Sequence, residues 1–287
     1  MTIPGVLRPA LAVAVLFGLA ACGERGAATA VPLSTARSVP AATDGLVLRA
    51  EYTGGFVGPS ATTGRLPVVS VYADGRVLAE GPVAAIYPGP ALPNVQVTRI
   101  DRGRVQGLVD QAVAAGVADT SDLGMPPVAD APSTRFTVVT ASHTYVREAY
   151  ALSETPAEGA GLTDEQHAAR AKLSELLAAL AGTAAGQDST PYAPAGVAAL
   201  ATPWLDPQDG LTQPDLPWPG PALPGEPIGG LPDLHCVTAT GDQAQALLTA
   251  AGSANAATPW VGSDGSRWTV IFRPLLPDES SCADLAD

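Results

Sequence analysis

The sequence predicts an α+β protein, with an antiparallel sheet that carries helices on one face and a small disulfide-stapled α+β unit after it. Its expected strands come in hairpins, most clearly around Asp74-Gly75, and hairpins join antiparallel neighbours. Two helices with recognisable start signals alternate with these hairpins instead of following every strand, which favours α+β over a parallel α/β fold. Two cysteines near the C-terminus, Cys236 and Cys282, suggest the staple.

The first 21 residues have the layout of a secretory signal peptide. One cation, Arg8, precedes an apolar run from Ala10 to Leu19, and small residues follow. The segment Leu19-Ala20-Ala21-Cys22 resembles the bacterial lipobox, in which the cysteine thiol receives a diacylglycerol and the peptide is cut just before it. We therefore expect a lipoprotein signal peptide at 1–21 and lipidation, including palmitate, at Cys22. An ordinary cleaved signal with a chance cysteine is the alternative.

Lipidation at Cys22 would attach the protein to the extracytoplasmic face of the cell membrane, because two or three acyl chains hold stably without a membrane-spanning segment. Residues 22–43 are small, polar and aperiodic, and we expect them to form a flexible tether. The chain has three cysteines, so the lipid would leave Cys236 and Cys282 as a pair. A disulfide between them is expected in an oxidising compartment, with two buried free thiols as the alternative.

The main α+β domain is expected at 44–183. Before its first helix, strands are expected at 46–52, 66–72, 76–80 and 95–100. Asp101 is placed to cap a helix with apolar residues at helical spacing, and Gly116 is placed to end it. A second hairpin at 135–140 and 144–150 follows. Thr163 and Gln166 then form a capping box for the second helix.

The remaining chain is expected to form a Pro-rich strap at 184–233 and a small C-terminal α+β unit at 234–287. There are 11 prolines between Pro191 and Pro232, and proline cannot donate to a sheet ladder. The C-terminal unit is expected to contain a strand at 236–240, a helix at 242–251 and a hairpin of 258–261 with 267–272. Asp278-Glu279 is expected in a solvated tail.

Several short segments of the mature chain resemble segments of uncharacterised exported lipoproteins of actinobacteria. They are 52–56, 66–77, 87–90, 218–221 and 273–279. The resemblance implies a location at the cell surface. It implies no activity and transfers no functional residue.

Composition excludes several function classes. The formal net charge is −13 and no basic stripe offsets it, so nucleic acid is excluded as a partner. The single lysine, Lys172, lies outside any phosphate-loop or S-x-x-K context. The histidines His143, His167 and His235 lack metal-ligand spacing, so we expect no metal site and no cofactor.

No catalytic motif stands out. Ser60 or Ser142 with His143 is the one serine and histidine combination that can be drawn, and a G-x-S-x-G motif is absent. The leading interpretation is therefore a non-enzymatic, lipid-anchored cell-surface protein that binds a protein or a cell-envelope glycan. An envelope-acting hydrolase with a site at the domain junction is the alternative, and a purely structural or inhibitory module is the third class.

Four aromatic residues are the candidate binding residues. Phe56 and Tyr87 lie in Gly/Pro-rich loops that we expect at the same end of the first sheet, where they would form a platform for a partner. The alternative is that both rings fold back over the core. Trp204 and Trp218 could line a sugar site, or they could anchor the core instead.

Overall fold

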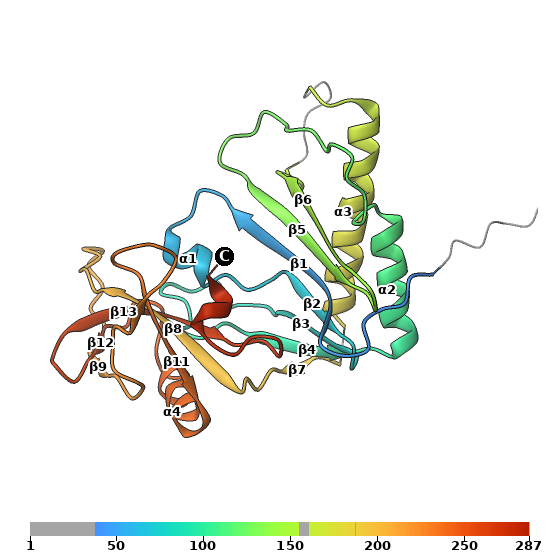
Figure 1. Cartoon of the computed structure of the whole chain (residues 1–287). Helices are drawn as coiled ribbons and strands as arrows, with labels where there is room; N and C mark the ends of the chain where they lie inside the picture. The colour runs from blue at the N-terminus through green and yellow to red at the C-terminus, as the bar shows by residue number, and fades with distance from the viewer. Residues whose placement is uncertain (1–37, 155–160, 187, 287) are drawn as a thin grey trace, which may run out of the picture. The chain divides into compact units, whose positions relative to one another are not determined.

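In the residues that the computed structural model describes, 38–154, 161–186 and 188–286, seven strands form a first sheet in the order β6-β5-β1-β2-β3-β4-β7 (Figure 1). All neighbours in this sheet are antiparallel, as the sequence predicts. The strands are β1 (Leu46–Gly54), β2 (Val69–Tyr72), β3 (Arg76–Glu80), β4 (Val95–Arg99), β5 (Pro132–Val139), β6 (Thr144–Tyr150) and β7 (Thr190–Pro191).

The turn between β2 and β3 forms where the Asp-Gly pair predicts it. Asp74 Oδ1 accepts a hydrogen bond from the backbone N–H of Arg76 at 3.0 Å. Gly75 has a φ of +85°, a conformation that glycine adopts without a Cβ penalty. The hairpin prediction is confirmed, and the turn fixes the register of β2 against β3.

Two helices, α2 (Arg102–Ala114) and α3 (Asp164–Ala184), cover one face of the first sheet (Figure 1). Both begin as expected. Asp101 accepts from the N–H of Arg104, and Thr163 with Gln166 makes the reciprocal capping box. Their buried faces join the sheet in one apolar core through Val105, Leu108, Val109, Ala112, Leu173, Leu176 and Leu180.

The segment 196–203 corrects the expectation of a Pro-rich strap, because it forms β8 (Gly196–Pro203), an inner strand of a second sheet. This sheet has the order β10-β11-β8-β13-β12-β9, and β8 pairs antiparallel with both β11 and β13. The other elements here are β9 (Leu216–Pro217), β10 (Glu226–Pro227), β11 (His235–Thr240), α4 (Gly241–Ala251), β12 (Trp260–Val261), β13 (Arg267–Pro274) and the short 3-10 helix η1 (Cys282–Leu285).

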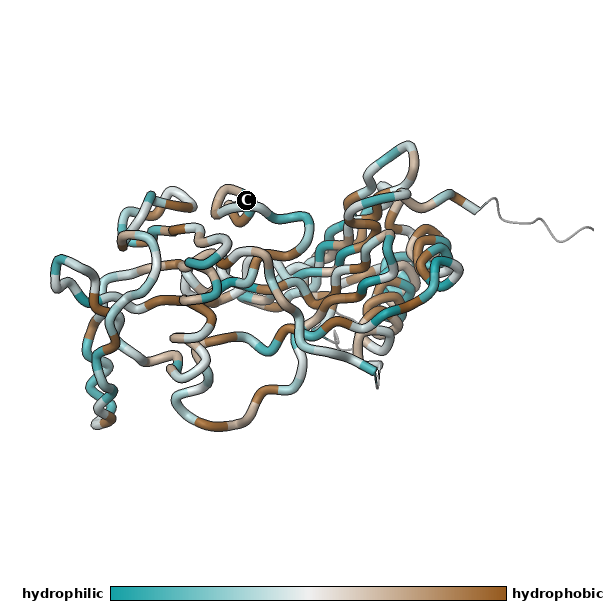
Figure 2. The backbone as a smooth tube through the Cα atoms, turned by 90° about the horizontal axis from the view of Figure 1, so that it is seen from below, coloured by the Kyte–Doolittle hydropathy of each residue, from teal (hydrophilic) through white to brown (hydrophobic). Residues whose placement is uncertain are grey.

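Proline does not interfere with β8 because it occurs only at the last position of the strand. The strand is buried on both faces. Val197, Ala199 and Ala201 pack into one apolar cluster, and Ala198 and Leu200 pack into another. Figure 2 shows hydrophobic segments, in brown, recurring along the backbone. Since β8 lies between β11 and β13, the expected C-terminal unit at 234–287 is completed by a strand from the preceding segment.

The start of the described chain is also more ordered than a tether. Ala41 forms a β-bridge with Thr140, and the backbone N–H of Ala42 donates to the carbonyl of Val139 at 3.2 Å. Residues 38–43 therefore belong to the fold, which corrects the expected tether boundary at 43. The expected signal peptide 1–21, Cys22 and the tether up to residue 37 lie outside the described residues. Within the described ranges, no helix has the length and apolar composition needed to cross a membrane.

Candidate functional site

Phe56 and Tyr87 are strongly exposed, and both loops leave the same end of the first sheet. Phe56 follows β1 and Tyr87 follows β3; these strands point the same way because each is antiparallel to β2 between them. The Phe56 side chain is 86% exposed and that of Tyr87 is 73% exposed. Tyr87 Oη donates to Asp209 Oδ2 at 2.9 Å, and this hydrogen bond raises the pKa of the phenol. Neither ring folds back over the core.

The two tryptophans have different surroundings. Trp218 packs edge-on against Trp260 at 5.7 Å and near Phe272 at 6.1 Å between ring centroids, and its Nε1 donates to the carbonyl of Pro221. This packing favours a core role for Trp218. Trp204 is half-buried, and the guanidinium of Arg267 lies 4.3 Å from the centroid of its ring.

Sequence reasoning missed a polar cleft of about 270 Å³ in which charged side chains gather. Its walls come from β1, from the chain between Thr62 and Pro67, and from the C-terminal segment. The lining arginines are Arg49, Arg65, Arg135 and Arg273. The lining carboxylates are Glu51, Glu279 and Asp284. Cations thus outnumber carboxylates in this cleft, although the whole chain has a formal net charge of −13.

Beside the cleft, Arg49 and Tyr72 hold Asp278. Arg49 Nη2 donates to both carboxylate oxygens at 2.9 and 3.0 Å, and Tyr72 Oη donates to Oδ1 at 2.6 Å. Burial, followed by the hydrogen bond to Asp278, raises the pKa of Tyr72 well above its ordinary value. Burial acts to lower the pKa of Arg49, but the charge of Asp278 and weaker neighbours keep it above its ordinary value. Asp278 is therefore a structural anchor, not part of a solvated tail.

A second pair, Arg273 and Glu279, is almost completely buried. Arg273 Nη2 donates to Glu279 Oε1 at 2.8 Å, and the backbone N–H of Leu276 donates to Oε2 at 2.7 Å. Arg273 Nη1 donates to the carbonyl of Pro274. Burial lowers the pKa of Arg273, and the charge of Glu279 offsets part of that effect. The Nε of Arg273 is buried and has no hydrogen-bond partner among the described residues.

Arg65 differs from the other arginines of the cleft in its partners. Its Nη1 donates to the carbonyls of Tyr52 and Gly54, both at 3.1 Å. Among the described residues, no carboxylate oxygen forms an ion pair with Arg65, whereas Arg49, Arg135 and Arg273 each have one. Arg65 therefore fixes the end of β1 while its charge lacks a carboxylate partner.

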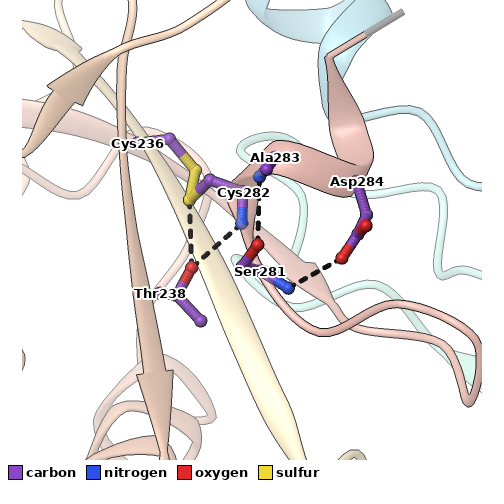
Figure 3. Close-up of a disulfide and its surroundings, with 6 residues drawn as sticks. All are labelled: Cys236, Thr238, Ser281, Cys282, Ala283 and Asp284. Carbon is purple, nitrogen blue, oxygen red and sulfur yellow. Dashed lines mark hydrogen bonds between the residues drawn. A yellow bond between two sulfur atoms is a disulfide. The ribbon is translucent and has the colours of Figure 1, made fainter.

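The disulfide between Cys236 and Cys282 is present, as the sequence predicts, and it joins β11 to η1 (Figure 3). Thr238 Oγ1 accepts from the N–H of Cys282 at 3.0 Å. Ser281 and Asp284 cap η1 reciprocally. Because Asp284 and Leu285 of η1 line the cleft, the disulfide and the cap together position one of its walls.

The serine and histidine combination considered from the sequence is partly brought together. Ser142 Oγ and His143 Nδ1 lie 2.8 Å apart at the exposed β5–β6 turn, and the ring of His143 stacks on Tyr145. Ser60 lies on the short helix α1 (Pro59–Thr63), away in sequence from this turn. In the described part of the chain, no three His, Cys, Asp or Glu side chains come together in a way that could hold a metal ion.

The geometry of these residues is the basis for any functional assignment, because the comparisons with known proteins add none. No family model, no curated protein and no solved structure matches the chain.

Proposed function

We propose that the protein is an exported, lipid-anchored binding protein at the extracytoplasmic face of the cell membrane. The Cys236–Cys282 disulfide is the observation that carries this proposal. Disulfides form and persist mainly in oxidising compartments outside the cytosol. The pairing also leaves Cys22, which follows the signal-like segment 1–21, as the remaining one of three cysteines.

Two features support a binding role. The cleft concentrates arginines, and burying charged groups costs free energy unless partners offset it. Phe56 and Tyr87 expose large rings from loops at one sheet end, where a protein or a cell-envelope glycan could contact them. The alternative, an envelope-acting hydrolase, would have to draw its acid and base from the cleft carboxylates. Glu279 and Asp284 both already accept internal hydrogen bonds.

The anchoring is tested by labelling cells that produce the full chain with a clickable palmitate analogue. We expect label on the protein, a mass that corresponds to cleavage before Cys22, and recovery in the membrane fraction. The Cys22→Ser variant serves as the control and should lose the label. An unlabelled chain that keeps residues 1–21 and stays in the cytosol would contradict the proposal.

The binding role is tested by crosslinking whole cells that carry either the natural chain or a Phe56→Ala/Tyr87→Ala variant. Met125→Ala is a matched control, because Met125 is also an exposed apolar side chain but lies in a different loop, between α2 and β5. We expect crosslinked partners to be lost in the double variant and retained in the control. Equal recovery by all three proteins would count against a platform at Phe56 and Tyr87.

A further inference from the structure

Within the cleft, the lining carboxylates are already engaged by the fold. Glu279 accepts from Arg273 and from the N–H of Leu276. Asp284 accepts from the backbone N–H groups of Ser280 and Ser281 at 2.7 and 3.0 Å. Glu51 lies 3.9 Å from Arg135. None of these carboxylates forms an ion pair with Arg65, so the charge of Arg65 is not offset by an ion pair among the described residues.

Two donor groups in the cleft walls are not matched by charged acceptors of the described chain. The Nη1 of Arg65 donates to two neutral backbone carbonyls, and Arg65 has no carboxylate counterpart. The Nε of Arg273 is buried and has no acceptor, on a side chain that is 2% exposed. A buried donor without an acceptor costs free energy, so native structures rarely keep one without a reason. The buried Nε of Arg273 is closed to solvent, whereas Arg65 is partly exposed and can still contact a bound acceptor.

We propose that this cleft binds a small ligand through an oxyanion, either a carboxylate or a phosphate, with Arg65 as its main cationic contact. The planar guanidinium fork matches both kinds of oxyanion geometrically. A cleft of about 270 Å³ accommodates a small molecule and not a folded partner. This inference goes beyond the contact surface at Phe56 and Tyr87, because it assigns a separate small-ligand site to the cleft.

The site also explains a contrast in charge. A chain with a formal net charge of −13 repels anions over most of its surface, and opposite charge must therefore be supplied locally. Arg65 supplies it, because each of the other three arginines of the cleft is ion-paired with a carboxylate. Arg49 lies on β1, Arg135 on β5 and Arg273 on β13, with Arg65 just after α1. The arrangement is thus a product of the folded state.

The test measures binding to the full chain, purified in detergent, by isothermal titration at low ionic strength. Three probes are used separately: inorganic phosphate, glucuronate as a carboxylate ligand, and glucose as its neutral counterpart. We expect phosphate or glucuronate to bind and glucose not to bind. The tighter of the two anions identifies which oxyanion the site prefers. Added salt should weaken the binding, because screening acts on partly exposed charges.

Arg65→Gln should weaken anion binding by about tenfold or more, because it removes the charge and one donor fork. Arg99→Gln is the matched control, since Arg99 is exposed on β4 and does not line the cleft. The Arg99→Gln variant should bind the anion with the same affinity as the natural chain. A third variant, Arg65→Lys, keeps the positive charge but lacks the guanidinium fork. We expect it to bind the anion more weakly than the natural chain does, and still in a salt-dependent way.

Three results would overturn the inference. The first is the absence of binding by both anions at concentrations up to about 10 mM. The second is an equal affinity of the natural chain and Arg65→Gln for the anion. The third is binding of glucose as tight as that of glucuronate. The result is separate from the anchoring test. A chain that fails to acquire lipid at Cys22 can still bind the anion, and a lipidated chain can fail to bind it.

Discussion

Arg273 donates a hydrogen bond to Glu279 at 2.8 Å, and the two side chains are only 2% and 6% exposed. A buried ion pair adds little net stability, but removing one partner leaves an uncompensated charge in the interior. Arg273→Met and Glu279→Leu should each lower the free energy of unfolding by about 3–5 kcal/mol.

The double variant Arg273→Met/Glu279→Leu should cost much less than the sum of the two single changes, because it removes both charges together. Urea denaturation of the natural chain, the two single variants and the double variant supplies the measurement. Strict additivity would mean that the two side chains are not energetically coupled.

Tyr72 also contributes to the stability of the fold, through its hydrogen bond to Asp278, the residue next to Glu279. Tyr72→Phe should destabilise the fold by about 2 kcal/mol at neutral pH, since hydrogen bonds to charged groups contribute about 1.5–3 kcal/mol. Denaturation at neutral pH checks this value, with Tyr145→Phe as a control on a partly exposed residue of β6.

The hydrogen bond between Tyr72 and Asp278 also predicts that the stability of the fold depends on pH. The folded state raises the pKa of Tyr72, so it holds the phenol proton more tightly than the unfolded state does. The contribution of Tyr72 is therefore complete below the unfolded phenol pKa of about 10 and is lost as pH rises above it. The stability difference between the natural chain and Tyr72→Phe should narrow above about pH 10. If the stability difference between the natural chain and Tyr72→Phe instead grew as the pH rises, the raised pKa of Tyr72 in the folded state would be contradicted.

Reduction of the Cys236–Cys282 disulfide should weaken the C-terminal part of the fold. The cysteines are 46 residues apart in sequence, and closing a loop of that length stabilises a fold by about 4 kcal/mol on the chain-entropy model. Cys236→Ala/Cys282→Ala should lower the free energy of unfolding by about that amount and abolish its dependence on reductant. Cys22→Ser should leave the dependence on reductant intact. The same dependence in both variants would place the redox-sensitive bond elsewhere.

Gly75 and Gly265 provide a matched pair of turn positions with φ values of +85° and +82°. A Cβ at Gly265 would meet open space, whereas one at Gly75 would overlap the carbonyl oxygen of Ile100. Gly265→Ala should therefore cost about 1–2 kcal/mol from backbone conformation alone. Gly75→Ala should cost about 2–5 kcal/mol, because the clash adds to that strain. Thermal denaturation compares them, and equal losses would contradict the role of Ile100.

Local signals in the sequence were sufficient for the elements of the first sheet. The cap at Asp101, the capping box at Thr163 and the Asp74-Gly75 turn each satisfy backbone groups within a few residues, so their outcome depends little on the rest of the chain. These predictions are confirmed. Boundaries shifted where tertiary pairing decided them, as at β5, which begins at Pro132 instead of residue 135.

The strand β8 and the cleft depend on distant partners and could not be predicted in this way. The alanine-rich run of β8 has little strand propensity of its own, and neighbouring prolines suggested a strap. Its small side chains instead allow close packing on both faces between β11 and β13. In the cleft, Arg49 and Arg273 stand far apart in sequence, and only the fold brings them together. Asp278 likewise acquired its partner Arg49 from a remote strand, whereas Glu279 pairs with Arg273 only six residues before it.

The placement of Asp278 has a consequence for biosynthesis. Its partners Arg49 and Tyr72 belong to β1 and β2, which lie 229 and 206 residues before it in sequence. During synthesis, Arg49 therefore has no access to this carboxylate until residue 278 has been made.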